Sequence, residues 1–463
     1  MDGNVQPRGG CRTLFCLTDG IHAEETLTTL MRVVDLIRTK RDGGALSTEE
    51  VDFFLRGFAK GEIPDHQASA LLMAIYYNGL SDRELADWTA SSAALGSPLN
   101  LSDLPGPKIS LHSAGGVGDK TRLIVGPLAA AAGVVVPMIV GRGLSYTGGT
   151  LDKVESIPGF NARLSSQEVQ AVLRKVGLAF VGPTEELAPV DRKLDSLRNA
   201  TGTVPSIALI AGSILSRKIA DGTDGLVVDV KTGSGALMKK MTDARRLAQS
   251  LVTVGKRLDQ KVVALITDMD QPLGNAVGNA LEVMEAIEAM RGGGPEDLVE
   301  LSLELAARLL CLAYPDRTLE NAKDQMFKLL GDGSALQKFR QMLEVQGANP
   351  QVIDNFELLP TASADFVISS PRAGHISRIS ADDVGQAVAL LAGRDAGAGE
   401  LDPAVGIVLE HKVGDRIQAG ERLCTIYYND KTHLAEASEM VEDAFHIAAA
   451  APEARALVYE VIQ

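Results

Sequence analysis

The sequence predicts an α/β protein with three parts: a small helical lobe, a large α/β domain around a mostly parallel sheet, and a C-terminal α+β domain. Three observations lead to this prediction. The chain has 463 residues, which is too long for one hydrophobic core. Helical periodicity runs from Met31 to about Ala94 and stops at a linker with proline and glycine, 98–108. Short β-rich runs then alternate with amphipathic helices, and from about Leu359 the chain is β-rich.

The first residues, 1–30, are expected to lie outside the folded part. They contain two arginines and two cysteines but no long apolar run, so a signal peptide is not indicated. We interpret the segment as a disordered N-terminal extension, or as the result of a misjudged start with Met31 as the true beginning.

The helical lobe is predicted from residues 31–95 together with 190–222, where the strand–helix alternation of the next domain is interrupted. Two capping boxes mark helix starts in the first part: Ser47 with Glu50, and Ser81 with Glu84. Apolar residues follow the first box at the i, i+3, i+4, i+7 spacing of a helix face: Val51, Phe54, Leu55 and Phe58. This pattern is typical of a small helical bundle.

The α/β domain is predicted from residues 96–189 and 223–358. Three apolar runs have the length of buried strands: "GVVVPMIV" (133–140), "GLVVDVKTG" (225–233) and "KVVALITDMD" (261–270). Between the first two runs, Ser165 and Glu168 form a capping box at the start of a helix that runs to Val176. Because strands that alternate with helices form a mostly parallel sheet, we expect the functional site at the carboxyl ends of the strands.

The C-terminal domain is predicted from residues 359–463. Its segment "HKVGDRIQAGERLCTIYY" (411–428) resembles a compact hairpin module of the lipoyl or barrel-sandwich type. No lysine lies at a hairpin tip, where a carrier domain of this type needs its attachment site. The module is therefore expected to have a structural role.

Composition argues against several classes of function. The chain has 45 basic and 60 acidic residues, a formal net charge of −15 at pH 7, and an acidic surface repels the phosphates of nucleic acids. The apolar run 123–140 contains two glycines and two prolines and is not expected to span a membrane. The four cysteines form no CxxC pair, which favours a reduced, cytoplasmic protein without disulfides or structural zinc.

The segment "SLHSAGGVGDKTR" (110–122) is a glycine-rich loop ahead of an apolar helix. It is not a P-loop, because that motif needs glycine directly before the lysine and Asp119 stands there; the GxGxxG pattern is not matched either. Such a loop is either a tight strand-to-helix turn or an anion site. In an anion site, the backbone N–H groups converge and the helix adds its positive end.

Five stretches in a fixed order make the pattern more specific: "HSAGGVGDKT" (112–121), "PMIVGRGLSYTGGTLDKVESIPGF" (137–160), "SILSRK" (213–218), "VVDVKTGSGALMKK" (227–240) and "TDMDQPLGNAVGNALEV" (267–283). Together they resemble the thymidine and pyrimidine-nucleoside phosphorylase family, from about Met31 to the C-terminus. The resemblance implies a fold like that of type II nucleoside phosphorylases, usually a homodimer, with the substrate in a cleft between the lobes. Family members transfer the sugar of a pyrimidine nucleoside to phosphate and release the base and a sugar 1-phosphate.

The base-binding end of the family site is largely retained. By resemblance, Arg198 holds a pyrimidine carbonyl, Ser213 bonds the edge of the base, and Arg217 replaces a lysine that bonds a carbonyl oxygen. His112 matches the histidine near the pyrimidine and is a candidate to donate a proton to its oxygen, and Leu144 completes the predicted base-binding set. Donors at that oxygen stabilise the negative charge that bond cleavage leaves on the base. The predicted catalytic residues are His112, Arg198 and Arg217.

The phosphate-binding end departs from the family pattern. Five family residues are replaced: a lysine by Leu111, a threonine by Ala114, two serines by Arg122 and Val140, and a histidine by Tyr146. Ser113 and Thr150 remain as phosphate-holding side chains. Because a charge-assisted hydrogen bond contributes about 1.5–3 kcal/mol, these losses weaken phosphate binding strongly. Arg122 offsets part of the loss if its guanidinium points into the pocket, and none of it if the side chain lies on the helix surface in an ion pair.

Three functions follow from this combination. The sequence favours a nucleosidase that cleaves the N-glycosidic bond of pyrimidine nucleosides and passes the sugar to water, because the base end is kept and the acceptor end is altered. The first alternative is a phosphorylase with a phosphate site rebuilt around Arg122, Ser113 and Thr150. The second is a catalytically inactive paralog that binds nucleosides.

No cofactor is expected, apart from phosphate as a possible co-substrate. The resemblance implies a monovalent or calcium ion near the glycine loop, held by backbone oxygens and an acidic residue, for which Glu285 is the matching carboxylate. The expected partner is a pyrimidine nucleoside, not a nucleic acid or a membrane. Asp195 and Asn199 flank Arg198 where the family has tyrosine and aspartate, so the preferred base stays open, as does the choice between ribose and deoxyribose.

Overall fold

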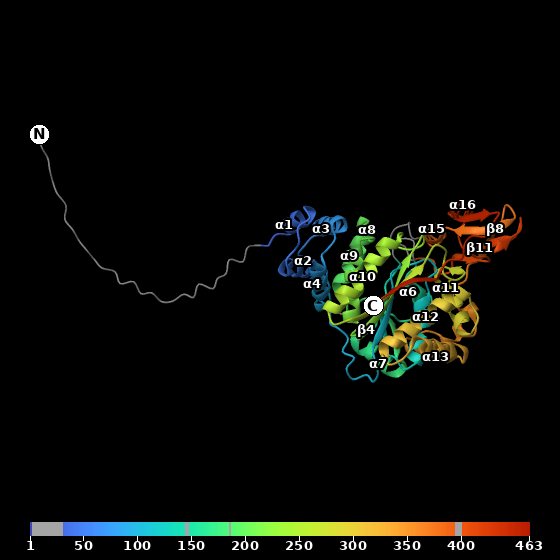
Figure 1. The fold of residues 1–463 in the computed structure, drawn as a ribbon, viewed down its shortest axis with the longest axis horizontal. Helices are drawn as coiled ribbons and strands as arrows, with labels where there is room; N and C mark the ends of the chain where they lie inside the picture. Colours follow the sequence, from blue (N-terminus) through green and yellow to red (C-terminus); the bar gives the residue numbers. More distant parts are fainter. Residues whose placement is uncertain (2–30, 144–147, 185–186, 394–400) are drawn as a thin grey trace.

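The computed structural model describes residues 1, 31–143, 148–184, 187–393 and 401–463. Figure 1 shows a helical lobe (blue), a central domain that holds the main sheet, and a C-terminal part (orange to red) on the other side of that domain. The predicted α/β fold is confirmed. The domain boundaries stay predictions, and the predicted N-terminal extension lies, apart from Met1, outside the described residues.

The helical lobe contains α1 (Val33–Arg41), α2 (Thr48–Lys60), α3 (Asp65–Asn78) and α4 (Asp82–Ala94), with α8 (Pro189–Thr201) and α9 (Ile207–Ala220) from later in the chain. Both predicted capping boxes are present, at Ser47 and at Ser81. Phe54 lies in the core of the lobe, with its ring centroid 5.6 Å from that of Trp88. Helices α8 and α9 pack against α2, α3 and α4, and α9 also packs against α10 (Met241–Arg257) of the next domain.

The strands of the α/β domain are β1 (Ile109–Ser113), β2 (Val136–Ile139), β3 (Leu178–Val181), β4 (Gly225–Thr232), β5 (Lys261–Asp268) and β6 (Ala276–Val277). Its helices are α5 (Thr121–Ala131), α6 (Thr150–Glu155), α7 (Ser166–Val176), α10 (Met241–Arg257), α11 (Asn279–Met290), α12 (Glu296–Ala313), α13 (Leu319–Gly331) and α14 (Ser334–Val345). In the main sheet, β1, β4 and β5 pair in parallel in that order, and β2 pairs in parallel with β3. Every residue of β4 is buried, because Val227 faces one core and Val228 another.

The C-terminal part begins with two short 3-10 helices, η1 (Pro350–Ile353) and η2 (Phe356–Leu358). It continues with β7 (Ala364–Ser369), β8 (Gly374–Ile379), α15 (Ala381–Leu391), β9 (Gly406–Leu409), β10 (Arg416–Ile417), β11 (Arg422–Tyr428), α16 (Leu434–Ala444), β12 (Phe445–Ala448) and β13 (Val458–Ile462). One antiparallel sheet has the order β6-β9-β11-β7 and another the order β10-β8-β12. The last strand, β13, instead pairs antiparallel with β5 at the edge of the main sheet, so the chain ends beside the central domain (Figure 1).

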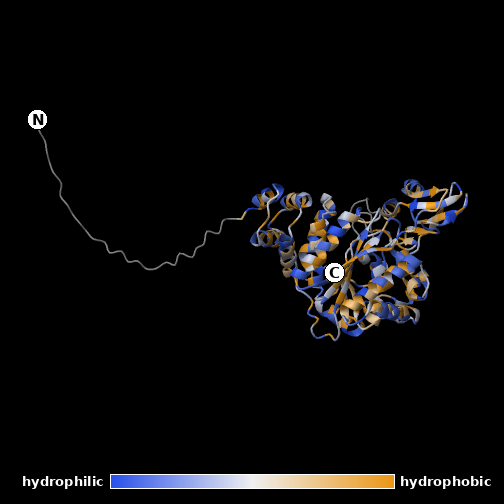
Figure 2. Ribbon diagram, in the orientation of Figure 1, coloured by the Kyte–Doolittle hydropathy of each residue, from blue (hydrophilic) through white to orange (hydrophobic). Residues whose placement is uncertain are grey.

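The longest apolar run of the sequence, 123–140, forms buried structure inside the α/β domain. It divides between α5, which contains Pro127, and β2. No helix in the described ranges is long and apolar enough to cross a bilayer. Figure 2 shows strong hydrophobic colour along the central strands, where the two largest cores meet the main sheet.

Candidate active site

A pocket of about 110 Å³ lies between the helical lobe and the α/β domain, at the carboxyl end of β1. The α/β domain contributes the glycine loop after β1, the turn after β2 and the start of α6, and the lobe contributes α8 and α9. This is the edge at which a parallel sheet usually carries its site. The pocket brings together seven of the predicted site residues: His112, Ser113, Arg122, Thr150, Arg198, Ser213 and Arg217.

Arg198 and Arg217 lie in buried positions on α8 and α9, where the base is predicted to bind. Asp195 joins them, because its carboxylate accepts a hydrogen bond from Arg217 and lies 3.4 Å from Nη1 of Arg198. Arg198 also donates from Nη2 to the carbonyl oxygen of Val204 at 2.9 Å. In both arginines, Nε has no partner within the described part of the chain. Each guanidinium therefore retains a donor, while Asp195 balances part of the positive charge.

Asp195 is a pocket residue to which the sequence analysis gave no role. It lies three residues before Arg198 on α8, and this spacing is a usable signal, because residues at i and i+3 are neighbours on a helix surface. The ion pair between Asp195 and Arg217 could not be predicted from spacing, since 22 residues separate the two along the chain. Leu144, the remaining predicted base-binding residue, lies outside the described residues.

His112 lines the pocket from the end of β1. Burial lowers the pKa of His112 well below its usual value, and the nearby charges of Arg122, Lys218 and Arg217 lower it further. The imidazole is therefore neutral near pH 7, and its Nδ1 has no partner among the described residues. A neutral imidazole donates a hydrogen bond readily but is a poor source of a proton in this setting.

Arg122 is buried and lines the pocket. Of the two placements that the sequence left open, in the pocket or on the helix surface, the structure therefore has the first. The Nη2 of Arg122 donates to the carbonyl oxygen of Ser113 at 3.2 Å, and this contact places the guanidinium beside the glycine loop. Burial lowers the pKa of Arg122 to about 10, so the side chain remains cationic at neutral pH. Ser113 and Thr150 line the same pocket.

Leu111 and Val140 do not line the pocket. Both side chains are fully buried in the largest hydrophobic core of the protein, together with residues of α5 and β2. Their replacement of polar family residues therefore removes hydrogen-bonding groups without placing an apolar surface against the substrate.

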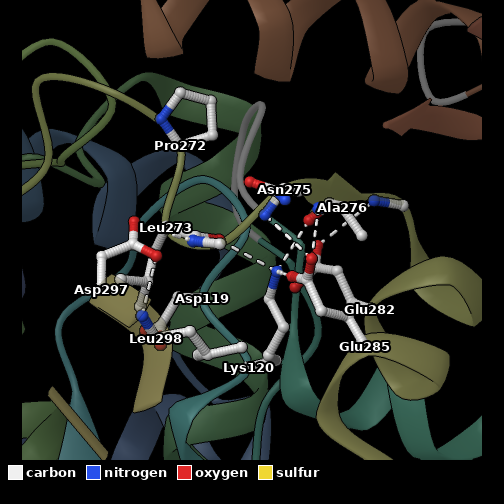
Figure 3. A network of polar contacts seen from close by, with 12 residues as sticks. Asp119, Lys120, Pro272, Leu273, Asn275, Ala276, Glu282, Glu285, Asp297 and Leu298 are labelled. Atoms are coloured by element: carbon white, nitrogen blue, oxygen red, sulfur yellow. Dashed lines mark hydrogen bonds and ion pairs between the residues drawn. The ribbon is translucent and has the colours of Figure 1, made fainter. Parts of the chain in front are cut away.

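Glu285, the predicted ion ligand, instead accepts a hydrogen bond from Lys120 (Figure 3). The Nζ of Lys120 also donates to the carbonyl oxygens of Leu273 at 3.0 Å and Ala276 at 2.8 Å. The backbone oxygens and carboxylate that an ion needs thus already surround an ammonium group, so these residues do not fit a separate ion. Among the described residues, no cluster of three or more His, Cys, Asp or Glu side chains could hold a metal.

Asp191 is a buried carboxyl on α8 whose ionisation is expected to destabilise the fold. Burial raises the pKa of Asp191 to about 6, although the charge of Arg217 opposes this rise. Between about pH 4 and pH 6 the folded state therefore binds more protons than the unfolded state, so stability falls as the pH rises through this window. We expect the Tm of Asp191→Asn to exceed that of the wild type by roughly 2–6 °C at pH 7.5 and to match it near pH 4, in scanning calorimetry.

The matched control for Asp191→Asn is Asp324→Asn, because Asp324 is an exposed carboxylate on α13. Its Tm is expected to follow that of the wild type at every pH. The Oγ of Ser216 donates to Asp191 at 2.8 Å, and an asparagine can accept the same bond. A lower Tm for Asp191→Asn at pH 7.5 would contradict the prediction, because it would mean that the ionised carboxylate stabilises the fold.

Family profiles match three separate parts of the chain. Residues 106–336 match the profile of the glycosyl transferase family a/b domain, residues 34–96 that of the glycosyl transferase family helical bundle domain, and residues 375–448 that of the pyrimidine nucleoside phosphorylase C-terminal domain. Anthranilate phosphoribosyltransferase from Thermus thermophilus superposes with a TM-score of 0.56 at 17% identity, over 67% of this chain and 99% of the other. At this identity, the similarity shows a shared fold.

Relatives of much higher identity extend over nearly the full length. The pyrimidine-nucleoside phosphorylase of Geobacillus stearothermophilus is 46% identical over 433 residues, which are 93% of this chain and 100% of the relative. That of Bacillus subtilis (strain 168) is 45% identical with the same coverage, and that of Staphylococcus haemolyticus is 47% identical over 86% of this chain and 92% of the relative. The resemblance inferred from the five motifs is confirmed, and the chain belongs to the pyrimidine-nucleoside phosphorylase family.

Proposed function

We propose that the protein catalyses the phosphorolysis of pyrimidine nucleosides. Phosphate attacks the anomeric carbon of the sugar, the N-glycosidic bond breaks, and the products are the free base and a sugar 1-phosphate. Relatives named pyrimidine-nucleoside phosphorylases, which align along their whole length, support the proposal. The observation that carries it is the buried, cationic Arg122 beside the glycine loop, in a pocket that retains Ser113 and Thr150.

Phosphorolysis replaces the nucleosidase reaction that the sequence favoured. That prediction depended on the replacement of five polar or basic family residues. Leu111 and Val140 do not line the pocket, Ala114 and Arg122 do, and Tyr146 lies outside the described residues. Of these replacements, Arg122 brings a cationic donor into the pocket. The full-length relatives are named as phosphorylases, and they give no support to water as the acceptor. The rebuilt phosphate site is therefore the better supported of the alternatives.

The proposed phosphate subsite consists of Arg122, Ser113, Thr150 and the backbone N–H groups of the glycine loop. Among the described residues, four arginines and two aspartates line the pocket, so the lining is net positive and suits an anionic nucleophile. The planar fork of an arginine bonds two phosphate oxygens at once, and converging N–H groups of a glycine loop hold a third.

The proposed base subsite consists of Ser213, Arg198 and Arg217, with His112 between the base and the glycine loop. Negative charge develops on the base as the glycosidic bond breaks, and donors fixed at its carbonyl oxygens stabilise the transition state more than the substrate. Because His112 is neutral, we assign it a hydrogen bond to the base rather than a proton transfer. The arginines supply the cationic donors of the site.

The test is an assay of uridine and thymidine with and without phosphate, in which the free base and the sugar product are both measured. We expect base release that depends on phosphate and yields sugar 1-phosphate. Free sugar at the same rate without phosphate would support the nucleosidase and overturn the proposal. Saturable nucleoside binding without turnover would overturn it in favour of an inactive paralog. The homodimer that the resemblance implies is proposed as well, and light scattering tests it as a mass twice that of the chain.

A further inference from the structure

Lys120, at the end of the glycine loop, is a fully buried lysine surrounded by oxygen atoms from distant parts of the chain. Its side chain has 0% exposure. The oxygens belong to Leu273 in the loop after β5, to Ala276 at the start of β6, and to Glu285 on α11. Between 153 and 165 residues separate them from Lys120 along the sequence. Figure 3 shows the ammonium group in the middle of this set, which we call the Lys120 cage.

The backbone at residues 274–276 holds Glu285 in place and leaves room for the ion pair with Lys120. Glu285 also accepts hydrogen bonds from the N–H groups of Asn275 at 2.9 Å and Ala276 at 3.0 Å, which fixes the carboxylate against the loop. Gly274 has φ +68°, and a Cβ there would lie 2.3 Å from Oε2 of Glu285 and 3.0 Å from Nζ of Lys120. Any other residue at 274 would therefore be strained and would press on the ion pair.

The oxygens of the Lys120 cage form the kind of set that also binds a monovalent cation. Two carbonyl oxygens and one carboxylate suit a hard cation of single charge, and an ammonium group offers the same charge with three N–H donors. Because all three donors of Lys120 have an acceptor at hydrogen-bond distance, the ammonium satisfies the cage without any further ligand. Its charge is compensated locally by Glu285, as a buried charge requires.

We propose that Lys120 is a built-in replacement for a bound monovalent cation, and that the protein consequently needs neither K⁺ nor Na⁺ to hold its glycine loop. The ammonium connects the start of α5, which directly follows the glycine loop, to the loop before α11. This connection fixes the geometry of the pocket wall that carries Ser113 and Arg122. The test below measures thermal stability, so its outcome does not depend on the reaction proposed for the pocket.

Lys412 offers a comparison on the same loop. Its Nζ donates to the carbonyl oxygens of Pro272 and Gly274 and to Asp297, but its side chain is 20% exposed. Water can replace that ammonium when it is removed, whereas the closed Lys120 cage gives water poor access. Lys412→Ala is therefore the control: it also removes a lysine that binds this loop, but it does not open a closed cage.

The experiment compares Tm in potassium, sodium and choline chloride at equal ionic strength. The wild type is expected to have the same Tm in all three salts. Lys120→Ala, which opens the cage, is expected to lose roughly 5 °C or more of Tm in choline chloride and to recover at least half of the loss in potassium or sodium chloride. Lys120→Met, which fills the space without a charge, should lose stability in every salt, and Lys412→Ala should respond equally to the three salts.

Two results would overturn the proposal. A wild-type Tm that is higher in potassium than in choline chloride would mean that the protein still binds an ion. A folded Lys120→Ala with the same Tm in all salts would mean that the cage does not recognise cations. If Lys120→Ala is insoluble when expressed, the wild-type comparison of Tm still decides. Refolding of the variant in potassium chloride but not in choline chloride then supports the proposal.

Discussion

Arg122→Met is expected to raise the KM for phosphate about 100-fold and to change the KM for the nucleoside little. Arg122 is cationic at neutral pH, and its loss removes the charge-assisted bonds that we propose it makes with phosphate. The described residues give its guanidinium one hydrogen bond, to the carbonyl of Ser113 at 3.2 Å, and methionine fills a similar volume. The fold should therefore survive the change. Initial rates at saturating uridine and varied phosphate measure the effect.

Arg142→Met is the matched control, because Arg142 also lines the pocket. Its side chain is 55% exposed and already paired with Asp152 at 2.9 Å and Glu155 at 2.7 Å. We expect its KM for phosphate to stay within about 3-fold of the wild type, as for most exposed ion pairs. The KM of Arg122→Lys for phosphate should lie between those of these two variants, since lysine keeps the positive charge but lacks the planar guanidinium that bonds two phosphate oxygens. An unchanged phosphate KM in Arg122→Met would show that the anion binds without this side chain.

Elements that local patterns encode could be predicted from the sequence. The capping box at Ser165 predicts the start of α7, and there the N–H of Glu168 donates to Oγ of Ser165. The apolar run 225–233 predicts a buried strand, and β4 occupies Gly225–Thr232. In each case the residues that decide the structure lie within a few positions of one another, so no knowledge of the tertiary fold is needed.

Contacts between distant segments could not be predicted in this way. The last strand, Val458–Ile462, reads as part of the C-terminal domain, yet it pairs with β5 in the main sheet. The glycine-rich loop can be identified from the sequence, but the partners of Lys120 cannot, since Glu285 is 165 residues away. Leu111 and Val140 are assigned to the acceptor subsite by alignment with the family pattern, while their burial depends on packing that the sequence does not reveal.

His112→Ala is expected to lower kcat about 100-fold, because it removes a donor from the oxygen that gains charge in the transition state. His112→Gln is expected to retain much more activity, since its amide still donates a hydrogen bond. Burial and the neighbouring cations hold the pKa of His112 well below its usual value, so the imidazole stays neutral around pH 7. The pH profiles of kcat for the wild type and His112→Gln should thus have the same shape around neutral pH.

These two variants separate a hydrogen bond from a proton transfer. If His112 delivered a proton to the base, glutamine could not replace it, because an amide does not titrate near neutral pH, and both variants would be impaired alike. The wild-type rate would then also follow the titration of an imidazole, and this dependence would vanish in both variants. The control is His66→Ala, because His66 is an exposed residue on α3 that does not line the pocket. This variant should have the kcat of the wild type. Burial of His112 among three cations makes the hydrogen bond the expected result, because protonation would add a fourth positive charge to that cluster.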